Sequence, residues 1–175
     1  MTVIVALYDN SQLWLGSNSQ GTVGATRLPG HESKWRFYGD WAIAFTGSGF
    51  PSEALAAKAK DFPGKAEDHQ QVTAYIRDVF EHFDIGEQKK MKNFDAQGLI
   101  VHRGGRIFDM DQYTSMSEVP KGTMWARGCG MDYALGADEV SKALSQTPED
   151  RIRRAVEASI ALDCDCPGHP IVEKF

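Results

Sequence analysis

The chain opens with Met1-Thr2-Val3-Ile4-Val5-Ala6, and this stretch is the most informative part of the sequence. The apolar run from Thr2 to Tyr8 predicts a strand without a polar face, of the kind that is buried on both sides. Removal of Met1 would give Thr2 a free α-amine beside its own hydroxyl. Because such an amine has a pKa of about 7.7–8.0, it can serve as the general base for that hydroxyl. One residue would then carry both nucleophile and base.

The composition describes an ordinary globular chain. Its 175 residues suit one domain, 1–175, with a real core, and we find no linker, repeat or low-complexity segment that would divide it. The net charge of −5 argues against nucleic acid or an anionic membrane as a partner. No apolar run approaches the roughly 20 residues that span a bilayer, and no signal-peptide pattern opens the chain. The cysteines, Cys129, Cys164 and Cys166, are a poor disulfide framework and predict the reducing cytoplasm.

Hydrophobic periodicity predicts blocks of strands that alternate with pairs of helices. The expected strands are Thr2–Tyr8, Leu13–Gly16, Trp35–Tyr38, Trp41–Phe45, Gly98–His102, Arg106–Met110 and Pro170–Phe175. The expected helices are Ser52–Ala59 with Ser52 as N-cap, Gln70–Phe83, Met131–Leu144, and a last helix capped by Thr147 with Pro148 in its first turn. The segment that holds Gly21, Gly24, Pro29 and Gly30 is expected to be broken and polar. This order lacks the strict alternation of a doubly wound parallel sheet. It favours two sheets packed face to face with helices outside each.

Five short motifs are informative because of their order along the chain. They are Gly16-Ser17-Asn18-Ser19-Gln20-Gly21-Thr22-Val23-Gly24, Gly30-His31-Glu32-Ser33-Lys34-Trp35-Arg36, Ala44-Phe45-Thr46-Gly47-Ser48-Gly49, Arg127-Gly128-Cys129-Gly130-Met131-Asp132-Tyr133-Ala134 and Asp163-Cys164-Asp165-Cys166. With the opening hexapeptide they resemble the proteasome β-subunit family of N-terminal nucleophile hydrolases. The likeness is strongest to the bacterial proteasome-like peptidase subunit that works with an ATP-driven unfoldase. The resemblance covers nearly the whole chain and implies an α+β fold, a four-layer α-β-β-α sandwich.

The resemblance assigns a role to each matching residue. Thr2 would be the nucleophile, and Lys34 would lower the pKa of its hydroxyl and disfavour charging of the α-amine. Gly47 would offer its backbone N–H to the developing oxyanion, which is typically worth about 3 kcal/mol. Asp163 would orient the Thr2 amine. Without the other motifs, Lys34 would be read as a surface lysine and Thr2 as a plain strand residue.

The chain departs from the family pattern at two positions. Asn18 stands where the family has a carboxylate that holds the lysine, and an amide can accept a hydrogen bond from Lys34 but supplies no negative charge. Cys129 stands where the family often has serine, and the serine of the last motif is replaced by Cys166. Cys129 as the nucleophile itself has no obvious histidine partner.

Cys164-x-Cys166-x-x-His169 suggests a metal site. This spacing matches no standard zinc pattern, and no second group of ligands stands near it in the sequence. The sequence therefore predicts no structural zinc site and no cofactor. The resemblance leaves open an ion held by backbone carbonyls around Cys166, as in some family members.

The resemblance implies a threonine-type endopeptidase subunit of a self-compartmentalising protease. It would assemble into stacked homo-oligomeric rings, cut unfolded polypeptide and work with an unfoldase. Two other functions stay open on the residues. Asn18, Cys129 and retention of Met1 would fit an impaired or inactive homologue with a structural or binding role. An N-terminal nucleophile amidase acting on a small amide is the third reading.

Overall fold

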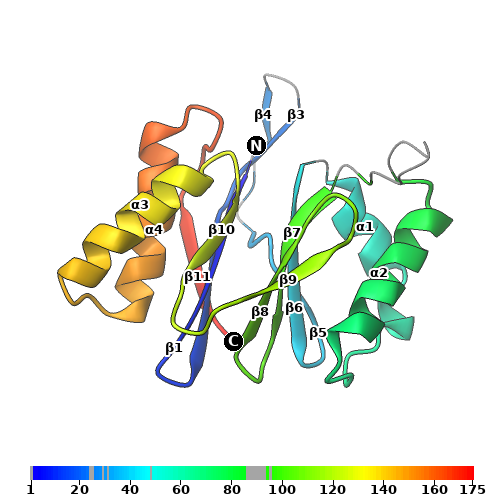
Figure 1. Ribbon diagram of the computed structural model, residues 1–175. Coiled ribbons are helices and arrows are strands. Elements are labelled where there is room, and N and C mark those ends of the chain that lie inside the picture. Colours follow the sequence, from blue (N-terminus) through cyan, green and yellow to red (C-terminus); the bar gives the residue numbers. More distant parts are fainter. Residues whose placement is uncertain are drawn as a thin grey trace.

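Two antiparallel sheets pack face to face in the described part of the chain, and a pair of helices covers the outer face of each (Figure 1). The structure is a computed structural model and describes residues 2–23, 26–28, 30, 32–47, 49–85, 94 and 96–175. The processing of Met1 and the motif positions Gly24, Pro29, His31 and Ser48 lie outside these residues.

The first sheet has the strand order β10-β1-β2-β11 and the second has the order β5-β6-β7-β8-β9. The first consists of β1 (Val3–Asp9), β2 (Gln12–Asn18), β10 (Trp125–Gly128) and β11 (Pro170–Lys174). The second consists of β5 (Arg36–Tyr38), β6 (Trp41–Gly47), β7 (Ala96–His102), β8 (Arg106–Met110) and β9 (Met116–Val119). The helices are α1 (Phe50–Ala57), the short 3₁₀ turn η1 (Ala59–Asp61), α2 (His69–His82), α3 (Met131–Ala143) and α4 (Pro148–Leu162), and β3 (Gly21–Val23) and β4 (Thr26–Leu28) form a separate hairpin.

Alternation along the strands explains the layers, because successive side chains point to opposite faces of a sheet. On β1, Val3, Val5 and Leu7 belong to the core beneath α3 and α4, whereas Ile4 and Ala6 belong to the core between the sheets. The absence of a polar face on this strand follows directly, since both of its faces are covered. The strand predicted from the opening stretch is confirmed.

The second sheet repeats this arrangement. Trp41, Ile43 and Phe45 of β6 pack beneath α1 and α2, and Ala42 and Ala44 face the other sheet. On β6 the large side chains therefore lie under the helices. Larger residues of other segments fill the core between the sheets, among them Trp35 and Leu99. The described residues thus form an α-β-β-α sandwich, and the predicted fold class is confirmed.

Several local predictions need correction. Ser52 is not an N-cap: α1 begins at Phe50 after Gly49, with Pro51 in its first turn. The segment expected to be broken and polar contains the β3–β4 hairpin. Strands β9 and β10 were not predicted, because each has only four residues and little apolar alternation. The cap at Thr147 is confirmed, since its hydroxyl accepts the Asp150 N–H at 3.2 Å. No helix among the described residues is long and apolar enough to cross a bilayer.

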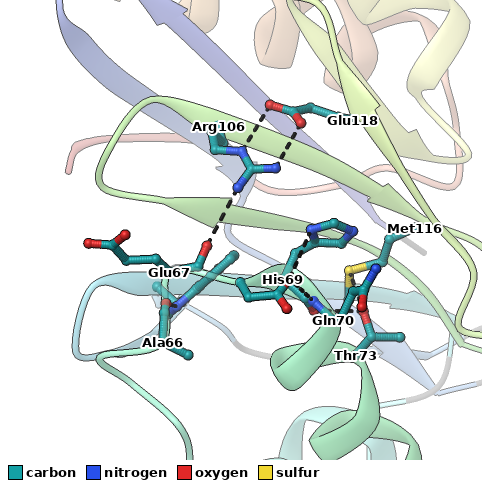
Figure 2. A network of polar contacts seen from close by, with 10 residues as sticks. Ala66, Glu67, His69, Gln70, Thr73, Arg106, Met116 and Glu118 are labelled. Carbon is teal, nitrogen blue, oxygen red and sulfur yellow. Dashed lines mark hydrogen bonds and ion pairs between the residues drawn. The ribbon is translucent and has the colours of Figure 1, made fainter.

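A polar network joins the start of α2 to the edge of the second sheet (Figure 2). Arg106 on β8 binds the Glu118 carboxylate of β9 through two hydrogen bonds of 3.0 and 2.9 Å and also donates to the Glu67 carbonyl at 3.5 Å. The Thr73 hydroxyl of α2 donates to the Met116 sulfur at 3.1 Å. The hydrogen bond from Arg106 lowers the pKa of Glu118. This network fixes α2 on the sheet and contains none of the predicted site residues.

The buried ion pair between α3 and α4 gives a stability prediction. Arg151 Nε lies 2.7 Å from Asp138 Oδ1, and the two side chains are 8% and 2% exposed. Arg151→Ala leaves the buried Asp138 carboxylate with Lys142, 3.1 Å from its Oδ2, as its remaining cationic partner. It also removes the cation that pairs with Asp9 at 3.5 Å. We therefore expect it to lower the free energy of unfolding by about 2 kcal/mol in urea denaturation, less than a fully unpaired buried charge would cost.

Arg153→Ala is the matched control on the same helix, since its pair with Glu149 is 42% and 49% exposed and should be worth less than about 1 kcal/mol. Equal losses in the two variants would contradict this account.

Candidate active site

Thr2 lies directly before β1, at the end of the first sheet, and is 9% exposed. Its position is set by antiparallel pairing of the next residue, Val3, with Gly128 at the end of β10. The thiol of Cys129 follows in the chain and donates to the Thr2 carbonyl at 3.4 Å. The pairing of Val3 with Gly128 and the hydrogen bond from the Cys129 thiol therefore fix the position of the Thr2 backbone.

The side chain of Lys34 forms a hydrogen bond with the hydroxyl of Thr2. Its Nζ donates to Thr2 Oγ1 at 3.2 Å and to the Gln20 carbonyl at 3.0 Å. The neighbouring Trp35 explains how the loop before β5 is held, because its buried indole N–H donates to the Gly16 carbonyl at 3.1 Å. The Lys34 backbone N–H also donates to the Ser17 hydroxyl at 3.3 Å. An amine and a hydroxyl 32 residues apart in sequence are thus brought within hydrogen-bond reach.

Burial lowers the pKa of Lys34, and the nearby thiols of Cys166 and Cys129 partly oppose this shift. Within the described part of the chain, no carboxylate forms an ion pair with Lys34. Desolvation without a counter-charge makes the ammonium less favourable than it is in water. The lysine is therefore easier to deprotonate than a surface lysine.

The Asn18 side chain bonds to backbone groups, and among the described residues no hydrogen bond joins it to Lys34. Its Oδ1 accepts the Val3 N–H at 3.0 Å, and its Nδ2 donates to the carbonyls of Gln20 at 3.0 Å and Pro167 at 2.8 Å. The side chain is fully buried, and an amide satisfies one donor and two acceptors where a carboxylate could satisfy only the donor. Asn18 and Lys34 are linked through the Gln20 carbonyl, which accepts from both.

The thiols of Cys129 and Cys166 and the carboxylate of Asp163 form a compact group, their ligand atoms all within 4.8 Å of one another. Cys129 lies in the turn before α3, Asp163 caps the C-terminus of α4, and Cys166 follows in the loop before β11. Burial raises the pKa of the Cys129 thiol, and burial next to Cys129 raises the pKa of the Cys166 thiol to about 12. Both thiols stay neutral at physiological pH, so Cys129 is a poor candidate for a thiolate nucleophile.

The other predicted site residues, Gly47 and Asp163, are related to Thr2 through neighbouring residues. Gly47 is the last residue of β6, exposed, with a φ of +98°. Its neighbour Thr46 lies beside Gly128, and Gly128 pairs with Val3, the residue that follows Thr2. The Asp163 carboxylate accepts the Asp165 N–H at 2.9 Å. The Asp163 carboxylate lies within 4.8 Å of the Cys129 thiol, and that thiol donates to the Thr2 carbonyl.

Sequence reasoning missed the backbone carbonyls of the site. The carbonyls of Gln20 and Pro167 organise Lys34 and Asn18, and no side-chain pattern reports a carbonyl. His169, considered as a metal ligand, instead shares a 3.0 Å hydrogen bond with the Ser19 hydroxyl. The only signal in the sequence was the clustering of polar residues after β2.

A four-layer sandwich with a threonine before its first strand and a lysine on that hydroxyl defines the proteasome-like class of fold. Solved structures agree. BPH from Thiobacillus denitrificans has a TM-score of 0.81 both alone, at 20% identity, and in complex with epoxomicin, at 19% identity, with 99% of this chain and 96% of that chain covered. Eukaryotic HslV from Trypanosoma brucei has a TM-score of 0.75 at 18% identity, with 98% of each chain covered.

These likenesses confirm the proteasome-like fold expected from the five motifs. No protein-family model and no curated protein sequence matches the chain. The function is therefore argued from the site.

Proposed function

We propose that this chain is a threonine-type endopeptidase subunit of a ring protease, with Thr2 as its N-terminal nucleophile after removal of Met1. The observation that carries the proposal is the 3.2 Å contact between Lys34 Nζ and Thr2 Oγ1. A nucleophile with an amine at hydrogen-bond distance, held in turn by a third group, is the arrangement that activates hydroxyls. Here the third group is the Gln20 carbonyl.

In the proposed reaction, Thr2 Oγ1 attacks the carbonyl carbon of a peptide bond, and the hydroxyl proton passes to the free α-amine of Thr2. Lys34 lowers the cost of charge on Oγ1 and, as a neighbouring cationic group, keeps the α-amine unprotonated. The Gly47 N–H is the proposed donor to the oxyanion of the tetrahedral intermediate. The amine then protonates the leaving nitrogen, and water hydrolyses the resulting ester on Thr2.

Cys129 and Asp163 complete the proposal as positioning residues. Cys129 holds the Thr2 carbonyl, and Asp163 lies within 4.8 Å of the Cys129 thiol. Asn18 holds the Val3 N–H directly after the nucleophile. These contacts fix the backbone on which the Thr2 amine and hydroxyl are carried, and small displacements of a nucleophile are costly in rate.

Assembly and partners are a further part of this proposal. We infer stacked homo-oligomeric rings that enclose the sites, unfolded polypeptide as substrate and an ATP-dependent unfoldase as partner. The three free cysteines fit a reducing cytoplasm. Light scattering of the purified chain tests the ring, since a closed monomeric particle would favour an amidase of the same fold.

A non-catalytic subunit is the second candidate, and Asn18 is the observation that favours it. The buried amide is fully engaged with backbone groups and gives Lys34 no negative partner. Without such a partner the lysine is less well anchored. A processed chain that forms rings but neither cleaves peptides nor binds epoxomicin, the compound bound to T. denitrificans BPH, would support this second candidate.

Lys34→Met tests the contact that carries the proposal. Methionine keeps the length and apolar stem of lysine but removes the amine on Thr2 Oγ1. In chain whose intact mass shows that Met1 is absent, kcat/KM for fluorogenic peptides should fall about 10²–10³-fold, the range typical for one electrostatic group of an active site. Lys60→Met, at an exposed lysine in the turn after α1, is the matched control and should cleave at the parent rate. A Lys34→Met chain as fast as its control would rule out this role of Lys34.

A further inference from the structure

In the proposed peptidase, Cys129 and Asp163 serve only to position Thr2, and Cys166 has no role of its own. Thr2 and Lys34 make contact without this group of three residues, and neither thiol is a suitable nucleophile. The members of the group come from two segments that are far apart in the sequence, the turn before α3 and the loop after α4. The fold nevertheless brings two sulfur atoms and a carboxylate oxygen within 4.8 Å of one another.

That spacing fits a soft divalent cation. Zinc binds cysteine sulfur at about 2.3 Å and carboxylate oxygen at about 2.0–2.2 Å in a tetrahedron. Two sulfurs on one zinc ion are then about 3.8 Å apart, so three ligand atoms within 4.8 Å need little movement to bind one ion. Thiolate ligands select zinc over magnesium or calcium.

We propose that Cys129, Asp163 and Cys166 form a binding site for a thiophilic divalent cation such as Zn²⁺. Three protein ligands leave the fourth position of a tetrahedron open. The site adjoins the proposed nucleophile, because the Cys129 sulfur lies 3.4 Å from the Thr2 carbonyl. Cys166 is completely buried and Asp163 partly buried, whereas Cys129 is exposed and gives the ion a path from solvent.

The charges of the site favour a cation of this kind. Ligation releases the two thiol protons, so the ligands together carry a charge of −3 and the loaded site −1. Lys34 Nζ lies 3.2 Å from Thr2 Oγ1 and Cys129 Sγ lies 3.4 Å from the Thr2 carbonyl, so both side chains contact the same residue and the Lys34 ammonium would balance the remaining charge.

Because the site lies beside Thr2, a bound ion should affect peptide cleavage, and this consequence rests on the proposed function. A bound ion would move Lys34 toward the metal-bound thiolates and occupy the space beside Thr2. The same ammonium cannot then support the Thr2 hydroxyl as well. Zn²⁺ should therefore inhibit peptide cleavage reversibly, and a chelator should restore it.

Binding is tested with Co²⁺ and Zn²⁺ on the full chain, kept reduced with a phosphine. We expect one Co²⁺ per chain with sulfur-to-cobalt charge-transfer absorption, and displacement of Co²⁺ by Zn²⁺. Cys129→Ser should weaken binding by at least ~100-fold, more than the 10–100-fold typical of losing an outer-shell partner, and should roughly halve the charge-transfer absorption per bound Co²⁺, because one thiolate ligand is left. Cys166→Ala should do the same. Cys164→Ser is the matched control, because Cys164 is exposed, lies in the same loop and is not part of the group.

The outcomes are separable from those of the peptidase proposal, since the spectrum does not depend on activity. Absence of thiolate bands in the folded parent chain would overturn the site. So would an unchanged affinity and an unchanged band intensity in Cys129→Ser. Loss of the bands in Cys164→Ser would also overturn the site, since it would place the ion on Asp163, Cys164 and Asp165 instead. Cys129 is exposed, so its variant reports on binding even if substitution at the buried Cys166 prevents folding. An inactive chain with intact bands would contradict only the proposed function.

Discussion

Thr2→Ala should abolish peptide cleavage and leave the fold intact. The change removes the hydroxyl that receives the Lys34 hydrogen bond but keeps the backbone that pairs through Val3 with β10. Loss of a nucleophile typically costs far more than loss of a helper, so kcat/KM for fluorogenic peptides should fall by at least ~10³-fold. The unfolding midpoint should change little, because a single neutral hydrogen bond is worth only about 1 kcal/mol.

Two further chains make this result specific. Thr2→Ser keeps a hydroxyl at the same place and should retain measurable cleavage. A chain shown by intact mass to retain Met1 has an amide in place of the α-amine and should be as inactive as Thr2→Ala, although its hydroxyl is present. If the Met1-retaining chain cleaves as fast as the processed one, the α-amine is not the base.

The sequence predicted the parts of the fold that depend on periodicity. The continuous apolar run of β1 indicated a strand covered on both faces, and Thr147 with Pro148 marked the start of α4. Short strands escaped prediction for a physical reason. β10 pairs along four residues and is stabilised by its neighbour β1, so its own sequence carries little signal.

The site likewise contains residues that the sequence predicts and contacts that it does not. Thr2 and Lys34 could be nominated from their residue types and order, and the structure places them in contact. The partner of Lys34 could not be foreseen, because the acceptor is a backbone carbonyl whose direction depends on the turn after β2. The same holds for the thiol pair, since Cys129 and Cys166 meet only when α3 and α4 pack on the first sheet.

Gly128→Ala should be the most damaging small substitution near Thr2. Gly128 has a φ of +103°, and a Cβ built there would lie 1.9 Å from the Thr2 carbonyl oxygen and 2.7 Å from its carbon. Both atoms belong to backbone, so no side-chain rotation relieves the clash, and β1 or β10 must move. The register between Val3 and Gly128 would be lost first.

Gly122→Ala separates this clash from the cost of backbone conformation. Gly122 also has a positive φ, +77°, but a Cβ there meets nothing within 4 Å. Its variant should lose about 1–3 kcal/mol of unfolding free energy from strain alone. Gly128→Ala carries the same strain and the clash, so it should lose clearly more in urea denaturation. Whatever fraction folds should cleave peptides at least ~10²-fold more slowly, because an ångström of displacement at Thr2 breaks its alignment with Lys34. Equal stability of the two variants would mean that β10 does not hold Thr2 in place.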